Sequence, residues 1–475
     1  MDDCHNYPNW ESLADPFLLT VFSYLDVQNL SAAGKACKNW CRVSLDESLW
    51  KAFAFQRVGC RYACHDDVTW KSELKRLIYH APIHLHQTCQ EHHREINYIC
   101  FSNSGNLIAT CGEDSIVKVW KYGNEIQLLF SRQVVDDPDH VNFVEFNQAE
   151  THLIAHCITP GGEFLCFEGI IMVLSIHTGA LCPVAARNSP SVPFRGTWLA
   201  NDTFLHADVL EDSPDDIQFL ACKFFNNGSE YSSLNDLITE ENVETKTVLQ
   251  INQQDSDLEY AKVIDWSQWN GDASNDSDVH SETNEKVLIL YLNNLSQTNE
   301  NELKFYRVDL DSTDPVISEP IRTIKINCLG LQLSADHRYL VCNTRRITVE
   351  DDNWRVEKDV ITMVIRLENT ESTPEIYGEN QPMESVTLST YFFPHVSPDY
   401  VAAESDRDVI FLWDRTSRQT ISKLSHRLPG QKNGVSAVAF HPRDQEVLVT
   451  VADDYKLRVW KSRNRLNSIA TGTMR

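Results

Sequence analysis

The chain has 475 residues, of which 42% are hydrophobic and 10% aromatic, so it has enough apolar material for a large packed core. The formal net charge of −26 argues against broad attraction to nucleic acid or to anionic lipid, because both are negatively charged themselves. No run of about 18 apolar residues is present, so we expect no membrane span.

The N-terminal sequence MDDCHNYPNW lacks the basic and apolar regions of a secretory signal. The 14 cysteines show no repeated short spacing, and without such a signal we interpret them as reduced thiols. These features predict a cytoplasmic protein, with the nucleus as a second location.

Residues 10–56 have the pattern of a small helical unit. Leu18, Phe22 and Leu25 follow the i, i+4, i+7 spacing of an amphipathic helix, and an Asp-Pro pair before them favours a helix start. Two further short apolar groups follow, the last ending at Trp50. A unit of this size is marginally stable alone, so it must pack against the rest of the chain or against another protein.

The stretch SLADPFLLTVFSYLDVQNLSAAGKACKNWCRVSLDESLW resembles an F-box. The family usually has proline directly after the first leucine of the motif; here Ala14 stands there, and Pro16 follows two places on. The resemblance implies that this unit packs on the Skp adaptor of a cullin-RING ubiquitin ligase of the SCF type. We therefore expect its apolar side chains to be exposed for that partner; a helical cap on the following domain is the alternative. The residues of the motif, with Cys37 beside the predicted adaptor contacts, are Leu13, Leu18, Phe22, Leu25, Leu30, Trp40, Leu49 and Trp50.

Residues 57–82 continue with a helical pattern. Leu74, Leu77 and Ile78 lie on one helical face, and Pro82 ends the run. The segment is not rich in glycine and serine, so we interpret it as a rigid helical connector.

From Ile83 onward the pattern changes to short β-rich runs separated by turn residues. INYICFSNSGNLIATCGEDSIVKVW and VSAVAFHPRDQEVLVTVADDYKLRVW share an order of strand, turn, strand ending in threonine, acidic turn and strand ending in tryptophan. A third copy, VSPDYVAAESDRDVIFLWD, carries a Trp-Asp dipeptide, and weaker copies are VNFVEFNQAETHLIAHC and CLGLQLSADHRYLVCN. Between Phe204 and Ile321 strands can be placed, but no clean repeat.

These runs resemble WD repeats, the blades of a β-propeller. At about 40–45 residues per blade, the segment could hold eight blades; we favour seven, with the remaining length in loops. The segment PIHLHQTC is expected to supply the outer strand of the last blade and so close the ring. In WD repeats a histidine, a threonine, an aspartate and a tryptophan form a structural hydrogen-bonded chain. The resemblance assigns these roles to His92, Thr110, Asp114 and Trp120, and to His426, Thr450, Asp454 and Trp460.

The predicted organisation is a small all-α F-box and helical linker followed by an all-β WD-repeat propeller. The boundaries are a tail at 1–9, the F-box at 10–56, the linker at 57–82 and the propeller at 83–475. A polar loop at 270–286 is expected to be disordered. It falls in an acidic region, 208–286, with 19 acidic and 4 basic residues, whereas 401–475 has 13 basic and 8 acidic residues. Solvated surfaces explain both; the alternative is a basic C-terminal face that meets an acidic partner.

A zinc site could use the residue types of one short cluster, which contains His84, His86, Cys89, His92 and His93. No second group of ligands with structural-zinc spacing accompanies it, and His92 already has a repeat role, so we predict no metal. The chain has no P-loop, no dinucleotide-binding glycine pattern, no His-Glu-x-x-His and no Gly-x-Ser-x-Gly elbow. We therefore predict no cofactor and no enzyme site.

The combined resemblance is to F-box/WD-repeat proteins, which implies a non-catalytic substrate receptor. Its partners would be the Skp adaptor, the cullin and RING subunits, and protein substrates bound on the propeller. Candidate phosphate-binding forks for a substrate are Arg345, Arg346, Arg407 and Arg415, although scattered surface arginines are the simpler interpretation.

Two alternatives remain open. Some WD proteins dock on cullin-4 ligases through Trp-Asp-x-Arg; here Trp413-Asp414-Arg415 places the arginine one position early, and Trp460-Lys461-Ser462-Arg463 lacks the aspartate. The chain could also be an interaction scaffold without a ligase role.

Overall fold

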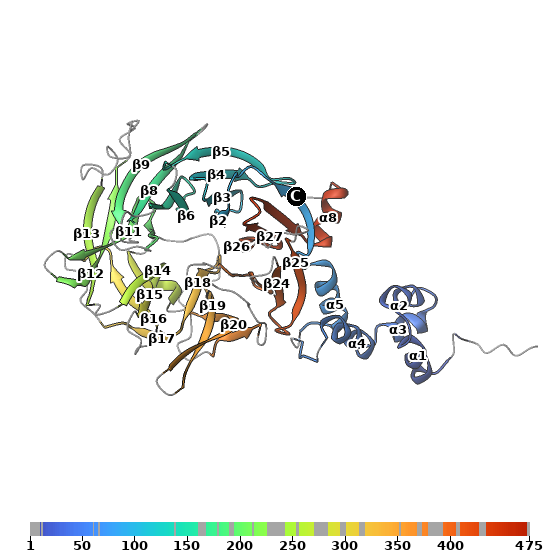
Figure 1. Ribbon diagram of the computed structural model, residues 1–475. Coiled ribbons are helices and arrows are strands. Elements are labelled where there is room, and N and C mark those ends of the chain that lie inside the picture. Colours follow the sequence, from blue (N-terminus) through green and yellow to red (C-terminus); the bar gives the residue numbers. More distant parts are fainter. Residues whose placement is uncertain are drawn as a thin grey trace, which may run out of the picture.

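A computed structural model describes a helical module at the N-terminus and a ring of seven four-stranded sheets (Figure 1). The described residues are 10, 13–59, 61–64, 67–136, 139–159, 168–177, 180–189, 194–210, 213–225, 243–252, 256–269, 284–294, 301–312, 319–350, 353–367, 373–378, 393–404, 409–426 and 434–472. Most of the polar loop predicted at 270–286 lies outside them; its last two residues begin a strand.

The helical module begins with three short helices and a longer fourth one. They are α1 (Asp15–Phe22), α2 (Val27–Ala33), α3 (Lys38–Ser44) and α4 (Glu47–Val58). Asp26 caps α2, accepting a hydrogen bond from the Asn29 amide at 2.7 Å. Ala14 is the N-cap of α1, and Asp15 is the first residue of the helix; the Asp15 carboxylate pairs with Arg42.

The connector is helical in two pieces. Helix α4 ends at Gly59, which adopts the left-handed conformation (φ 85°) that stops a helix at little cost for glycine. A second helix, α5 (Trp70–Tyr79), starts at the Thr69 cap and leads directly to the propeller. The single continuous run suggested by the sequence is therefore interrupted.

Each blade of the propeller is an antiparallel sheet whose strands follow one another in the chain. The first three blades are β2 (Ile96–Phe101), β3 (Leu107–Gly112), β4 (Ile116–Lys121), β5 (Gln127–Gln133); β6 (His140–Phe146), β7 (His152–Thr159), β8 (Glu168–His177), β9 (Ala180–Ser189); and β10 (Thr197–Ala200), β11 (Thr203–Leu210), β12 (Ser213–Phe224), β13 (Val243–Asn252).

The remaining four blades complete the ring, with the last one using a strand from the start of the propeller. They are β14 (Ser256–Asp265), β15 (Glu285–Asn294), β16 (Glu302–Asp309), β17 (Arg322–Lys325), with the short helix α7 (Trp266–Trp269) after β14; β18 (Cys328–Leu333), β19 (Tyr339–Glu350), β20 (Asn353–Arg366), β21 (Glu375–Tyr377); β22 (His395–Val396), β23 (Tyr400–Glu404), β24 (Val409–Asp414), β25 (Thr420–Ser425); and β26 (Val435–His441), β27 (Asp444–Ala452), β28 (Leu457–Lys461), β1 (His84–Cys89). The chain ends its described part with α8 (Arg463–Ala470).

Seven blades, rather than eight, are thus confirmed. The predicted closing strand is also confirmed: β1 pairs with β28, with His84 opposite Lys461 and Cys89 opposite Leu457. The region without a clean repeat forms most of the third and fourth blades. We call the end of the propeller where the first strand of each blade turns into the second the proximal end, and the opposite end the distal end.

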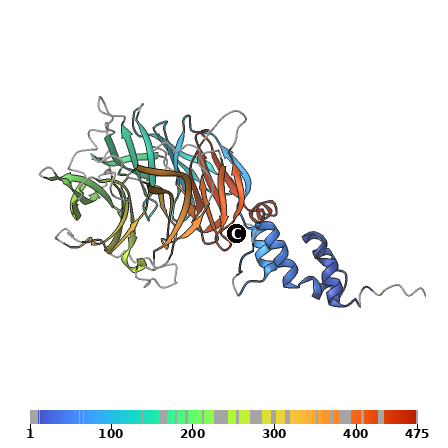
Figure 2. The same cartoon turned by 60° about the horizontal axis from the view of Figure 1, so that its bottom comes forward.

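Helix α5 contributes to two hydrophobic cores. Leu74 packs with the apolar residues of α1 to α4, whereas Leu77 and the following Ala81 pack with residues of the sixth and seventh blades. The helical module projects from one side of the ring beside α8 (Figure 2). Its attachment therefore rests on the side of α5 that carries Leu77.

Replacing Leu77 by alanine should loosen this attachment. The side chain is fully buried, and leucine-to-alanine changes at such sites cost about 2–5 kcal/mol. We expect faster protease cleavage between the helical module and the propeller, and a larger radius of gyration by small-angle scattering. Lys75→Ala, on an exposed position of the same helix, is the control and should change neither. Equal behaviour of the two variants would contradict the role given to Leu77.

Candidate partner-binding surfaces

The apolar stripe identified in the sequence forms the core of the helical module. Leu18 and Phe22 are each only 1% exposed, and the edge of the Phe22 ring packs against Trp40, with ring centroids 5.6 Å apart. Leu30, Leu49 and Trp50 are buried in the same cluster, and Leu13, Leu25 and Trp40 are partly buried against it. The expectation that these side chains are exposed for a partner is therefore wrong for Leu18, Phe22, Leu30, Leu49 and Trp50. A small helical unit needs its strongest apolar stripe for its own core.

A second apolar row lies on the outer side of α1. Phe17 and Val21 are 66% and 45% exposed, and Tyr24, in the turn after the helix, is 86% exposed. Their spacing is again i, i+4, i+7, one residue before the buried stripe. Trp10 and Leu45 are also large exposed apolar residues of this module. Sequence reasoning missed this row, although α1 is apolar on both sides and both stripes are visible in DPFLLTVFSYL.

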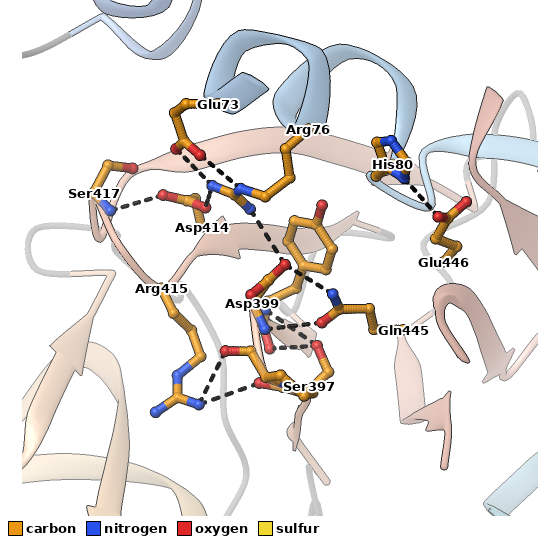
Figure 3. A network of polar contacts seen from close by, with 12 residues as sticks. Glu73, Arg76, His80, Ser397, Asp399, Asp414, Arg415, Ser417, Gln445 and Glu446 are labelled. Carbon is orange, nitrogen blue, oxygen red and sulfur yellow. Dashed lines mark hydrogen bonds and ion pairs between the residues drawn. The ribbon is translucent and has the colours of Figure 1, made fainter. Parts of the chain in front are cut away.

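A polar network fixes α5 to the proximal end of the propeller (Figure 3). The Arg76 guanidinium donates to Glu73 within the helix, at 2.8 and 2.9 Å, and to Asp414 at the end of β24. Asp414 is 0% exposed and also accepts from the Ser417 amide at 2.7 Å. A second tie joins His80 to Glu446 of β27, with Nδ1 2.6 Å from Oε1. Helix α5 is thereby attached to both the sixth and the seventh blade.

The first predicted tetrad has the expected geometry. The Thr110 hydroxyl lies 2.9 Å from both His92 Nε2 and Trp120 Nε1, and His92 Nδ1 lies 2.8 Å from Asp114. Burial lowers the pKa of His92, against the opposing effect of the Asp114 hydrogen bond. These groups join strands β3 and β4, the turn between them and the loop before β2, so their role is structural.

In the second tetrad an arginine side chain lies between the histidine and the aspartate. His426 Nε2 and Trp460 Nε1 lie 2.8 and 2.9 Å from the Thr450 hydroxyl, as expected. Among the described residues of this blade, His426 and Asp454 do not contact each other directly, because the Arg458 side chain lies between them. Its Nη1 lies 2.8 Å from His426 Nδ1 and 3.0 Å from Asp454 Oδ1. In the first blade the corresponding position is Lys118, which bonds Ser131 instead.

Of the four candidate substrate arginines, the structure describes the side chains of Arg345 and Arg415. Arg415 is bound internally: its guanidinium pairs with Glu375 of the fifth blade at 2.8 Å and lies over the Tyr339 ring at 4.1 Å. It directly follows Asp414, which pairs with Tyr400 at the proximal end. Arg345 lies in β19, partly buried; Arg407 and the side chain of Arg346 are outside the described residues. Arg415 is thus corrected from a substrate contact to a tie between blades.

The stretches considered for cullin-4 docking are also engaged internally. Asp414 and Arg415 hold the contacts described above, and Lys461 is 1% exposed, with its ammonium donating to the Asn124 carbonyl at 2.8 Å. Arg463 lies over the Tyr79 ring of α5.

Among the described residues, no group of three or more His, Cys, Asp or Glu side chains could hold a metal ion. In the histidine cluster considered for zinc, His86 contacts the Asn124 carbonyl at 2.8 Å and His92 belongs to the tetrad. Within the same described part of the chain, no helix is long and apolar enough to cross a membrane.

Comparison with known proteins agrees with this architecture. Residues 10–56 match the F-box-like family model, and residues 84–121 and 422–461 match the model of the WD domain, G-beta repeat. The chain thus has an F-box-like segment and WD repeats, and in this it is similar to the F-box/WD-repeat proteins. It is 24% identical over 548 residues to F-box/WD repeat-containing protein 5 of Mus musculus, covering 95% of this chain and 93% of that protein. The proteins of the same name from Rattus norvegicus and Homo sapiens are 24% and 23% identical over similar lengths, covering 95% of this chain and 94% of each relative.

The position of Arg458 between His426 and Asp454 leads to a prediction about stability at different pH values. Burial, and then the charge of Arg458, lower the pKa of His426 well below 6.5. Since the unfolded histidine binds a proton more readily, the stability that neutral His426 contributes is full above about pH 6.5 and is lost as the pH falls below it. Arg458→Met should cost about 3–5 kcal/mol near pH 7.5, because Asp454 loses its partner.

In that variant His426 is free to protonate and pair with Asp454, so acid should destabilise it less. We therefore expect the stability gap between wild type and Arg458→Met, measured by urea unfolding, to narrow from about pH 7.5 to about pH 5.5. Other titrating groups cancel in this comparison. A gap that stays constant or widens in acid would show that Arg458 does not control His426.

Proposed function

We propose that this F-box/WD-repeat protein is the substrate receptor of an SCF-type cullin-RING ubiquitin ligase. In this proposal the helical module binds the Skp adaptor, which joins it to the cullin and RING subunits. The propeller binds protein substrates, which are then ubiquitinated and degraded. The chain itself contributes binding and positioning, which raise the local concentration of substrate lysines near the ubiquitin-conjugating enzyme. The same proposal places it in the cytoplasm or nucleus.

The observation that carries this proposal is the exposed row Phe17, Val21 and Tyr24. Large aromatic side chains that remain exposed together are costly in water and favour a protein interface. They belong to the segment that matches the F-box-like model, and they do not contribute to the core of their own module. We therefore move the proposed adaptor contact from the buried stripe to this outer row.

The attachment of α5 supports the second half of the proposal. The module is held at the proximal end by contacts to two blades, so the distal end is left clear of it. A receptor of this kind needs a fixed distance between the adaptor and the bound substrate, and a helix that packs on both domains provides one.

Two alternative functions have less support than the SCF receptor. For cullin-4 docking, the residues of the candidate motif are held inside the propeller. A scaffold without a ligase role would leave the outer row of α1 without an adaptor, and a pull-down with and without residues 1–56 separates the two cases. Recovery of Skp, cullin and RING subunits only with residues 1–56 supports the ligase; stable partners of other kinds alone support the scaffold.

A charge on the outer row should remove adaptor binding without unfolding the module. For Phe17→Asp and Tyr24→Asp we expect at least a tenfold weaker affinity for purified Skp adaptor, measured by calorimetry, because an aspartate would be desolvated in the interface. The melting temperature should change little, since both positions are exposed.

The matched control is Phe22→Asp on the inner stripe. This variant should lower the melting temperature of the helical module, because it buries a charge in the core, and it loses adaptor binding only through unfolding. If Phe17→Asp and Tyr24→Asp bind the adaptor as tightly as wild type, the outer row is not the adaptor surface.

A further inference from the structure

A row of exposed side chains with two positive charges runs along the connector helix. Helix α5 carries Lys71, Lys75 and Tyr79 at the spacing i, i+4, i+8, and all three are exposed. Side chains at this spacing lie one above the other on the same side of a helix. Leu77, two residues after Lys75, points to the opposite side, where it packs on the sixth and seventh blades. The row therefore faces away from the propeller.

The positive charge continues from both ends of this row onto neighbouring helices (Figure 1). At the start of α5, the Lys71 ammonium lies over the Trp50 ring of α4 at 4.9 Å, and the exposed Lys51 follows that tryptophan in the chain. At the end of α5, the exposed guanidinium of Arg463 in α8 lies over the Tyr79 ring at 5.8 Å. We call these four cations the basic strip: Lys51, Lys71, Lys75 and Arg463.

Aromatic rings hold three of the four cations in place. The Lys51 ammonium lies 5.4 Å from the Trp70 ring and 5.5 Å from the Phe55 ring, and Lys71 and Arg463 lie over the rings described above. A cation on an aromatic face is attracted to it and loses freedom of motion, while its outer side stays in water. Part of the entropy cost of ordering these long side chains is thus already met before a partner binds. Ordinary surface lysines lack this preparation.

The acidic groups of the same helices are used inside the protein. Glu73 is buried and bonds Arg76, and Glu47 accepts a hydrogen bond from the Trp70 amide at 2.7 Å. Helix α8 contains no acidic residue. Asp67, before α5, is exposed and pairs with no cation of the described residues. Among those residues, no carboxylate forms an ion pair with the basic strip, so its charge is unpaired although the chain as a whole has a net charge of −26.

We propose that the basic strip binds an acidic segment of a partner protein. Ammonium and guanidinium groups form charge-assisted hydrogen bonds with carboxylates. A short acidic segment touches only the strip, whereas a nucleic acid or an anionic membrane extends beyond it and meets the negative charge of the rest of the chain. From residue 71 to residue 79 the strip measures about 12 Å, which is the length of about four extended residues.

This surface is separate from the one proposed for the adaptor. The outer row of α1 is apolar and lies on another helix, so the basic strip goes beyond the proposed ligase function and does not need the adaptor. The strip also spans the junction of the two parts of the molecule, because α8 directly follows β28, the last strand of the ring in chain order. A partner bound along it would contact the helical module and the propeller side at once.

The test uses the full-length protein and three fluorescent probes: a peptide with a run of glutamates, the same peptide with glutamines, and a single-stranded oligonucleotide with the charge of the glutamate peptide. Affinities are measured by fluorescence anisotropy. We expect the glutamate peptide to bind at least tenfold more tightly than the glutamine peptide at about 0.05 M salt, and to lose most of this preference at about 0.3 M salt. Equal affinity for the two peptides would overturn the proposal, and so would an oligonucleotide that binds as tightly as the glutamate peptide.

Charge reversal locates the site on the strip. Lys75→Glu and Arg463→Glu change two different helices, and each should weaken binding of the glutamate peptide about threefold to tenfold, with a larger loss in the double variant. The matched control is Arg57→Glu, which changes the net charge equally. Arg57 is exposed on the same helix as Lys51, but about 120° away around the helix axis. It should leave the affinity nearly unchanged.

An equal loss in Arg57→Glu and Lys75→Glu would show that net charge alone attracts the peptide, and would contradict the strip. The melting temperature of all three single variants should stay close to that of the wild type, since the positions are exposed. Phe17→Asp should bind the glutamate peptide as the wild type does, whatever its effect on the adaptor. Failure of the adaptor proposal and failure of the basic strip are therefore distinguishable.

Discussion

The arrangement of the whole molecule depends on α5, which is a shared element of two hydrophobic cores. Leu74 completes the core of the helical module, and Leu77, one turn further on, completes the core of the sixth and seventh blades. Since both side chains leave the same short helix, the module cannot turn relative to the ring without breaking one of the two cores. The exposed row on α1 is therefore held in a fixed position with respect to the propeller.

Polar contacts make this docking specific. Asp414 is fully buried, and a buried carboxylate is stable only when it is paired. The guanidinium of Arg76 supplies that partner from outside the blade, and Glu73 orients it from one turn away. The Trp-Asp dipeptide of this repeat thus has a role that its motif does not reveal: the aspartate at the end of β24 receives the connector helix. Apolar packing supplies the attraction between the parts, and the ion pair selects one orientation of the helix.

The sequence predicts the parts of the fold whose stability comes from local repeats. Thr110 and Trp120, like Thr450 and Trp460, are ten positions apart because the two side chains meet across adjacent strands, so their spacing identifies the first and last blades. The third and fourth blades are held by apolar strand packing, which leaves no fixed spacing of polar residues to recognise. The contacts of Arg458 with His426 and Asp454, and the Arg415–Glu375 pair, are not predictable in the same way. In the first, an arginine replaces a contact that the motif assumes; in the second, the partner is 40 residues away in another blade.

The candidate surface on α1 exposes a more general limit of hydrophobic patterns. A helix with apolar residues on two sides must bury one of them in its own domain, and periodicity alone does not say which. The side that is available to a partner can be identified only when the other side is known to be buried in the domain, as Leu18 and Phe22 are here.

Ring closure and presentation of the helical module are physically linked. Helix α5 ends at Tyr79 and β1 begins at His84, so the strand that closes the ring follows the connector almost at once. That strand pairs with β28, which is followed directly by α8, and Arg463 of α8 packs over Tyr79. The connector therefore docks where the two ends of the propeller meet, on the sixth blade and on the seventh, which is complete only when β1 pairs with the last repeat. Without the seventh blade, Leu77 would lose part of its packing surface and His80 would lose Glu446, so the module has its full set of contacts only on a closed propeller.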